Sequence, residues 1–100
     1  REVISLHAEA GNYEQVKSLG QKALDIFPTQ SWLFLMMGTA KNELGEFKEA
    51  EANLMEGLDY LIDDVKTERE FQRQLVKTYE GLNEPQKASE ALKKAKELEK

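Results

Sequence analysis

The sequence predicts an all-α fold made of successive helix pairs, and three observations support this prediction. Ala, Leu, Glu and Lys dominate the chain, 33% of its residues are charged, and it contains only 6 Gly and 2 Pro. This balance favours helices, whereas a sheet would need more Val, Ile and Thr. An unbroken apolar run at 32–37 leads through a turn at 44–47 to a second segment with helical periodicity. The third observation is that such segments recur along the chain.

The apolar spacing and the turn residues predict six helices, at residues 1–10, 13–27, 30–44, 47–61, 66–82 and 85–98. Segment 30–44 carries apolar residues on more than one face, so we expect it to have neighbouring helices on both sides. Pro28 ends the second helix, and Pro85 suits the first turn of the sixth. N-cap or neighbouring positions are assigned to Asn12, Thr29 and Asp64.

The helix pairs repeat in the sequence. Gly11 and Tyr13 recur 34 positions later as Gly45 and Phe47. A third copy, offset by 38 positions, is recognised from the matches of Leu44 with Leu82, Ala50 with Ala88, Leu54 with Leu92, Gly57 with Ala95 and Tyr60 with Leu98. The extra residues of this longer offset fall within 61–67. Because they are close to one helical turn in number, we expect them to lengthen a flanking helix and keep its buried face in register.

This pattern resembles the tetratricopeptide repeat, a helix-turn-helix unit, over essentially the whole chain. The matching positions are the small residues Gly38, Ala50 and Gly57, the turn pairs Gly11/Tyr13 and Gly45/Phe47, the closing Pro28, and Tyr79, Ala88 and Ala95 in the third unit. The departures are Val16, Ile62, Asn83 and Pro85, and they are expected to weaken individual turns. Small residues at Gly38 and Ala50 let antiparallel helices approach closely.

The resemblance implies a single domain over residues 1–100, with three helix hairpins at about 1–28, 29–62 and 63–100. It also implies a right-handed superhelical stack whose first hairpin lacks its start, so we expect the chain to be a fragment of a longer protein. The connection after residues 56–59 is loosely similar to repeats of bacterial cell-envelope tetratricopeptide proteins. The compartment stays open between the cytoplasm and the bacterial periplasm or cell envelope.

Charge and composition argue against several functions. The net charge of −5 repels nucleic-acid backbones, so no nucleic-acid partner is expected. The chain has no Cys, and no apolar run is long enough to span a bilayer. His7 is the single histidine, and in the repeat register it falls at a position usually taken by a packing aromatic side chain. We therefore expect no enzyme activity. The acidic residues Asp59, Asp63 and Asp64 lack the spacing of a calcium loop, and neither a metal nor a cofactor is expected.

The resemblance further implies that the first helix of each unit lines a concave surface that receives extended peptides. The predicted groove residues are Trp32, Leu35, Met36, Thr39, Asn42, Arg69, Gln72, Arg73 and Lys77. Arg69, Arg73 and Lys77 are spaced four apart and form one cationic row. Arg69 and Arg73 match two basic positions of family members that clamp a peptide's carboxylate, but Ser5 and Met36 replace the clamp's asparagines. The other interpretation is that these arginines are ordinary solvated side chains.

We therefore expect a non-catalytic scaffold that binds a protein or peptide, with a preference for an acidic or C-terminal carboxylate group. Two alternatives stay open: a structural spacer within a longer repeat array, and a regulatory domain of a larger enzyme. Self-association through exposed repeat ends is a third way to use the same surface. In that case Trp32 and Met36 are covered by the first helix or by a second copy.

Overall fold

The computed structural model describes residues 2–99 of the chain, and side-chain environments from residue 4 onward. Its regular elements in that range are six α-helices: α1 (Glu2–Glu9), α2 (Tyr13–Ile26), α3 (Ser31–Glu43), α4 (Phe47–Asp59), α5 (Val65–Gly81) and α6 (Pro85–Glu97). Every predicted helix is present, with small differences at its ends. The prediction of an all-α fold is confirmed.

The same turn conformation joins α1 to α2, α3 to α4 and α5 to α6. Its positive-φ residues are Gly11 at 78°, Gly45 at 78° and Asn83 at 59°. In each turn the residue that follows the positive-φ residue donates its backbone N–H to the carbonyl five residues earlier, with an N···O distance of 2.8 Å. The three pairs are Asn12 to His7, Glu46 to Lys41 and Glu84 to Tyr79. This is the Schellman arrangement. Asn83 was expected to weaken the third turn, but asparagine tolerates the left-handed region and the turn is kept.

Glycines allow adjacent helices to approach closely. A Cβ atom at Gly38 on α3 would lie 2.5 Å from the Cγ atom of Leu54 on α4. A Cβ atom at Gly57 would lie 2.6 Å from both Phe34 Cβ and Phe71 Cε1. Real Cβ atoms do not approach other atoms this closely, so a larger residue at either position would force the helices apart.

The core is centred on α3. This helix contacts α1, α2, α4 and α5, and it has more buried residues than any other helix. The fully buried side chains around it come from three other helices, with Val16 on α2, Leu54 on α4 and Phe71 on α5. The prediction that this segment has neighbours on both sides is confirmed.

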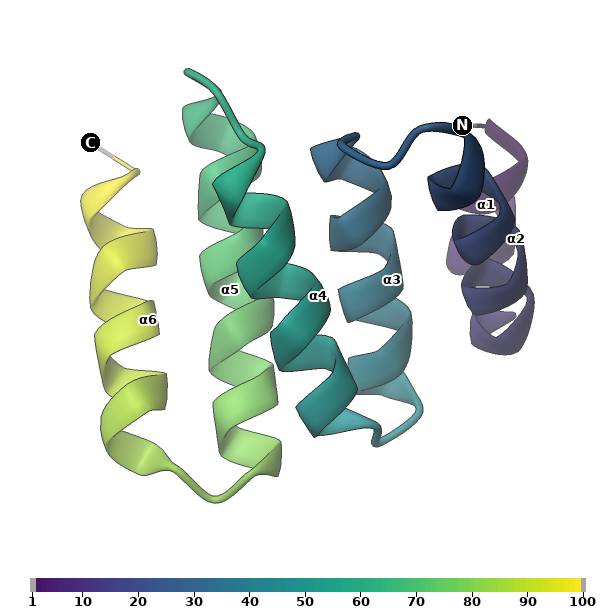
Figure 1. Cartoon of the computed structure of the whole chain (residues 1–100). Coiled ribbons are helices and arrows are strands. Elements are labelled where there is room, and N and C mark those ends of the chain that lie inside the picture. The colour runs from purple at the N-terminus through teal and green to yellow at the C-terminus, as the bar shows by residue number, and fades with distance from the viewer. Residues whose placement is uncertain (1, 100) are drawn as a thin grey trace.

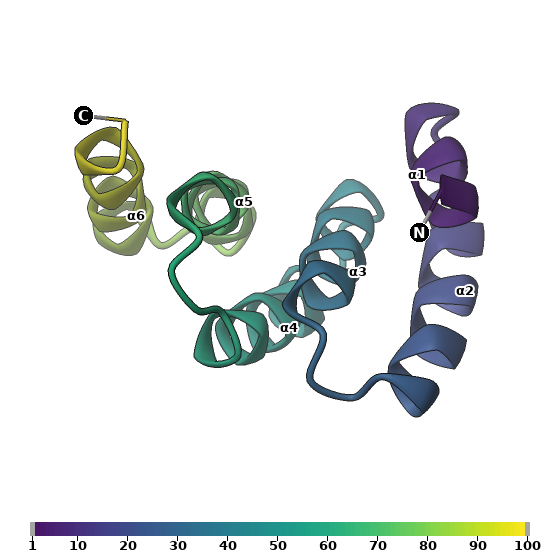
Figure 2. The same cartoon turned by 90° about the horizontal axis from the view of Figure 1, so that it is seen from above.

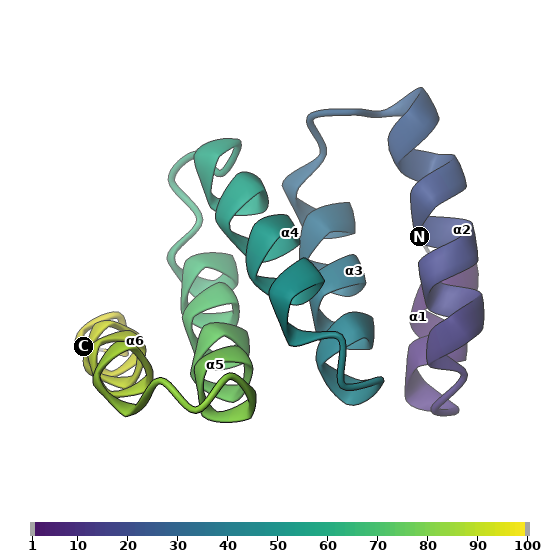
Figure 3. The same ribbon diagram turned by 60° about the horizontal axis from the view of Figure 1, so that its bottom comes forward.

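The six helices form a curved row. Consecutive helices run antiparallel, so α1, α3 and α5 point in the same direction (Figure 1). Seen from above, the row bends into an arc (Figure 2), and a tilted view shows α4 beside both α3 and α5 (Figure 3). Besides its sequence neighbours, α3 contacts α1 and α5. The parallel helices α3 and α5 therefore share one face of the row.

The additional residues of the third unit extend α5, which has 17 residues where α3 has 13. The extension lies at its N-terminus, so the prediction of a lengthened helix is confirmed. There Asp64 accepts hydrogen bonds from the Thr67 backbone N–H at 3.0 Å and from its hydroxyl at 2.7 Å. Asn12 is also at an N-cap, but its side chain makes no capping bond. Thr29 lies one residue before the cap of α3.

Candidate functional site

The predicted groove residues lie on α3 and α5, and an ion pair shows how these parallel helices are aligned. Lys77 Nζ lies 3.8 Å from Glu43 Oε1. Residues four apart stack on one face of a helix. Arg73 lies one turn before Lys77, and Thr39 lies one turn before Glu43, so Arg73 and Thr39 are at the same level. Arg69 lies a further turn toward the N-terminus of α5. The predicted row of three cations therefore runs beside α3.

The structure differs from the predicted groove at three residues, because their side chains are buried. Leu35 is 8% exposed, Asn42 6% and Gln72 7%. Leu35 belongs to the hydrophobic core. Gln72 lines a hollow of about 240 Å³ between α4 and α6, together with Met55 and Leu58. All three side chains are buried, and Gln72 faces the hollow between α4 and α6, so none of them is exposed on the predicted groove.

Asn42 joins α3 to α5 through a buried polar network. Its Nδ2 donates to the Gln74 backbone oxygen at 2.9 Å and to Gln74 Oε1 at 3.0 Å. Its Oδ1 accepts a 2.7 Å hydrogen bond from the hydroxyl of Thr78, which is fully buried. Since both ends of the amide are paired, Asn42 holds the two helices in register and offers no amide to a ligand.

Gln74 and Thr78 were not among the predicted residues. Thr78 lies on the same side of α5 as Phe71 and Leu75, which are buried. A polar residue at an inward position indicates a buried hydrogen bond. That signal was present in the sequence, but the identity of the partner depends on how α5 is aligned with α3.

Arg73 is already paired with carboxylates. Its Nη1 lies 2.7 Å from Glu70 Oε1, and its Nη2 lies 2.6 Å from Glu99 Oε1, beyond the end of α6. The hydrogen bond to Glu99 is the main cause that raises the pKa of Arg73, and the charge of Glu70 adds to it. A ligand carboxylate would have to compete with both groups for this guanidinium.

Arg69 differs from the other two cations of the row. Among the residues that the structure describes, it forms no ion pair, while Arg73 and Lys77 each face an acidic side chain. Its Nε atom is buried without a hydrogen-bond partner. The positive charge that this row offers to a ligand is therefore concentrated at Arg69.

Trp32, Met36 and Thr39 are partly buried on α3. The Thr39 hydroxyl donates a 2.8 Å hydrogen bond to the Leu35 carbonyl, one turn back on the same helix. Trp32 and Met36 pack against the core, and Trp32 also lines a pocket together with Ile4 of α1. Of the predicted α3 residues, Met36 and Thr39 thus remain partly accessible, and they lie on the same side of α3 as Glu43, which pairs with Lys77.

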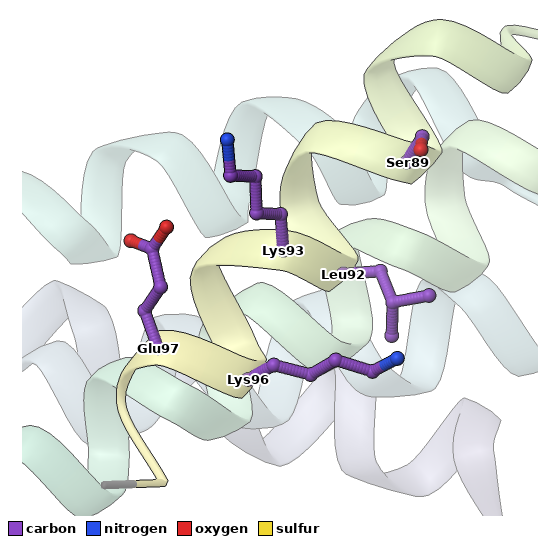
Figure 4. Close-up of a pocket in the computed structure, with 5 residues that line it drawn as sticks. All are labelled: Ser89, Leu92, Lys93, Lys96 and Glu97. Carbon is purple, nitrogen blue, oxygen red and sulfur yellow. The ribbon is translucent and has the colours of Figure 1, made fainter.

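A further hollow, of about 430 Å³, lies on the surface of α6. Its lining residues are Ser89, Leu92, Lys93, Lys96 and Glu97, all from that one helix (Figure 4). The labelled side chains extend in different directions and do not converge on a common point (Figure 4). This surface is the charged exterior of a helix, with Leu92 44% exposed among the charges.

His7 and Tyr79 lie outside the α3–α5 face, and their surroundings are those of side chains that pack within the fold. His7 is half-buried, and its Nδ1 lies 3.4 Å from Asn12 Nδ2. Burial, assisted by a hydrogen bond with Glu51, raises the pKa of Tyr79 to about 12.

Within residues 2–99, no three His, Asp or Glu side chains are grouped to hold a metal ion. In the same range, no helix combines the length and apolar character needed to cross a bilayer.

Comparison with known proteins does not assign this chain to a family. It matches no protein-family model and no curated protein. The candidate site is the face where α3 contacts α5. On α3 it has the half-buried Met36 and Thr39, about two turns and one turn before Glu43, and on α5 it has Arg69, Arg73 and Lys77, of which Lys77 pairs with Glu43.

Proposed function

We propose that this chain is a non-catalytic protein-interaction scaffold of the tetratricopeptide type. Its binding surface is the α3–α5 face, which comprises Met36, Thr39, Arg69, Arg73 and Lys77. The observation that carries the proposal is the placement of a partly exposed apolar side chain beside a row of cations on two parallel helices. Arginine is over-represented among the residues that dominate binding energy.

The proposal includes the arrangement of the chain as three hairpins, at about 1–28, 29–62 and 63–100, in a right-handed superhelix. Its support is the recurrence of one turn geometry at Gly11, Gly45 and Asn83. The contacts of α3 with both α1 and α5 are a second support, because stacked hairpins bring alternate helices together. Curved stacks of this kind present extended surfaces that suit extended ligands.

The charges on the α3–α5 face favour a partner segment with a free carboxylate. Arg69 has no acidic partner among the described residues, so it is the cation that a carboxylate reaches without displacing another group. Planar guanidinium groups pair with carboxylates through two parallel hydrogen bonds. Glu70 and Glu99 both compete with a ligand for Arg73, which limits how strongly the face binds acidic ligands.

The test is a titration of fluorescently labelled peptides that end in a free carboxylate, an amide or a basic residue. We expect the free-acid peptide to bind the parent chain most tightly. Arg69→Ala should weaken this binding about tenfold to a hundredfold, because it removes the guanidinium that pairs with the carboxylate. Glu99→Gln should strengthen binding because it removes one of the two carboxylates that pair with Arg73. Glu97→Gln is the matched control, since this nearby exposed carboxylate is not paired with Arg73.

Light scattering during the same titration reports the mass of the protein. Affinities that are equal for the free-acid and amidated peptides, and unchanged by Arg69→Ala, would contradict the carboxylate preference. A dimer that dissociates on Trp32→Ala would instead support self-association through this region.

A further inference from the structure

The hollow of about 240 Å³ between α4 and α6 lies over α5. Both helices pack against α5, but their backbones do not contact each other. The apolar part of its lining comes from all three helices, with Met55 and Leu58 on α4, Leu75 on α5 and Ala91 on α6. Its volume is below the roughly 300–1,000 Å³ of clefts that bind drug-sized ligands, so the hollow suits a single side chain.

Gln72 contributes an amide to this hollow. The residue is 7% exposed, and among the residues that the structure describes it has no hydrogen-bond partner. Neither amide atom is sealed from solvent, and because Gln72 lines the hollow, the amide is accessible from there. Buried amides normally have partners, since a hydrogen bond left unmade is costly. Gln72 therefore has both a donor and an acceptor available to a ligand.

The second hairpin fills the corresponding place with an aromatic ring. Phe34 precedes Gln72 by the 38-residue offset of the third unit. Phe34 is buried, and the centroid of its ring lies 5.5 Å from that of Tyr60. The third hairpin thus has a polar side chain where the second packs two aromatic rings. Apolar packing alone does not explain a glutamine at this position.

We infer that this hollow binds the glutamine side chain of a partner segment that lies across α4 and α6. A carboxamide both donates and accepts, so it pairs with the Gln72 amide through two hydrogen bonds and leaves neither end unsatisfied. A carboxylate only accepts and an ammonium group only donates, so each would leave one end of Gln72 unpaired. The methylene groups of the inserted glutamine pack against the apolar part of the lining. Because α4 and α6 do not contact each other, a segment lying across them inserts this side chain from the surface.

The charges around the hollow favour a neutral occupant. Lys87 is already paired, since its Nζ lies 3.7 Å from Glu84 Oε2. Glu90 and Lys94 also line the hollow, and within the described part of the chain neither forms an ion pair. These two charges are of opposite sign, so together they give no net preference for an anion or a cation.

The test is an NMR titration of the ¹⁵N-labelled chain, followed at the side-chain amide of Gln72 and at the backbone amides of Leu75 and Ala91. The probe is a peptide of alanine and serine with an acetylated N-terminus, an amidated C-terminus and one glutamine. Two twins carry glutamate or methionine in place of that glutamine. We expect saturable shifts with the glutamine peptide, and binding about tenfold tighter than that of either twin, from the two added hydrogen bonds.

Two variants locate the binding at Gln72. Gln72→Met removes the amide and keeps the length of the side chain, so we expect it to bind the methionine twin at least as tightly as the glutamine peptide. Gln72→Leu is expected to lose the preference in the same way, and it decides the question if circular dichroism shows that Gln72→Met does not fold. The matched control is Gln86→Met, which alters an exposed glutamine of α6 outside the hollow and should keep the preference of the parent.

Equal affinities of the three peptides for the parent chain would overturn the inference. Signals of Gln72 that never shift would overturn it as well, because water alone would then satisfy the amide. So would a folded Gln72→Met variant that still prefers the glutamine peptide, or free glutamine that binds as tightly as the peptide, which would indicate a small-molecule site.

The hollow shares no residue with the α3–α5 face, and the probes have no free carboxylate at their C-terminus. Arg69→Ala is therefore expected to leave binding of the glutamine peptide unchanged. Failure of the hollow can thus be distinguished from failure of the proposed function.

Discussion

Two threonines illustrate how a residue's neighbours decide its role. Thr39 and Thr78 both place a hydroxyl within hydrogen-bond distance of the carbonyl four residues earlier, at 2.8 Å and 3.0 Å. Thr39 is half-buried on α3, whereas Thr78 is fully buried and also donates to Asn42 on the facing helix. The same residue type thus contributes to a partly open surface in one place and to a link between helices in the other.

Thr78→Val is predicted to destabilise the fold by about 1–3 kcal/mol, because Asn42 Oδ1 would be left buried without a donor. Thr39→Val is the matched control, and its cost should stay within about 0.5 kcal/mol because no second residue depends on its hydroxyl. Urea denaturation of both variants measures the difference. Equal losses of stability would show that the Asn42 network does not hold α3 to α5.

Tyr79 is predicted to make stability fall in alkaline solution. Its pKa is raised from 10.0 to about 12 in the folded chain, so the unfolded chain loses the phenolic proton first as the pH rises. The contribution of Tyr79 to the free energy of unfolding is fully present below pH 10, and it is lost as the pH rises through about 12. Urea midpoints measured across this window should fall more steeply for the parent than for Tyr79→Phe. Parallel slopes would contradict the assigned shift.

At the scale of helices and turns, the sequence was sufficient where the signal is local. The six helices and the extension of α5 follow from apolar spacing, and the repeated turns follow from glycine at two of three positions. Local pattern was less informative at the caps: Asp64 makes a capping bond while Asn12 does not. Whether a capping side chain reaches the first turn depends on local geometry that residue type alone does not determine.

Close approach of α3 and α4 is predicted to make the buried small residues intolerant of larger ones. Ala50→Leu should lower stability by about 1–3 kcal/mol, because Ala50 is fully buried and overpacking strains its neighbours. Gly38→Leu should act in the same direction, since even a Cβ atom there would meet Leu54 at 2.5 Å. Ala52→Leu, at an exposed position of α4, is the control. Melting within a degree of the parent for Ala50→Leu would contradict this packing.

At the scale of the whole molecule, the candidate site was predicted in part. The four-residue spacing placed Arg69, Arg73 and Lys77 in one row, because that relation lies within a single helix. The pairing of Arg73 with Glu99 depends on where the end of α6 lies, and no local pattern contains it. Burial of Leu35, Asn42 and Gln72 likewise depends on contacts with neighbouring helices.

The arc of helices has two sides, and we propose that partners bind the side on which α3 and α5 meet. A free-acid peptide that carries a nitroxide spin label tests this claim directly, because the label broadens the amide signals of residues close to it. We expect the strongest broadening at Met36, Thr39, Arg69 and Arg73. Broadening confined to α2, α4 or α6, with the α3–α5 face unchanged at saturation, would contradict the account.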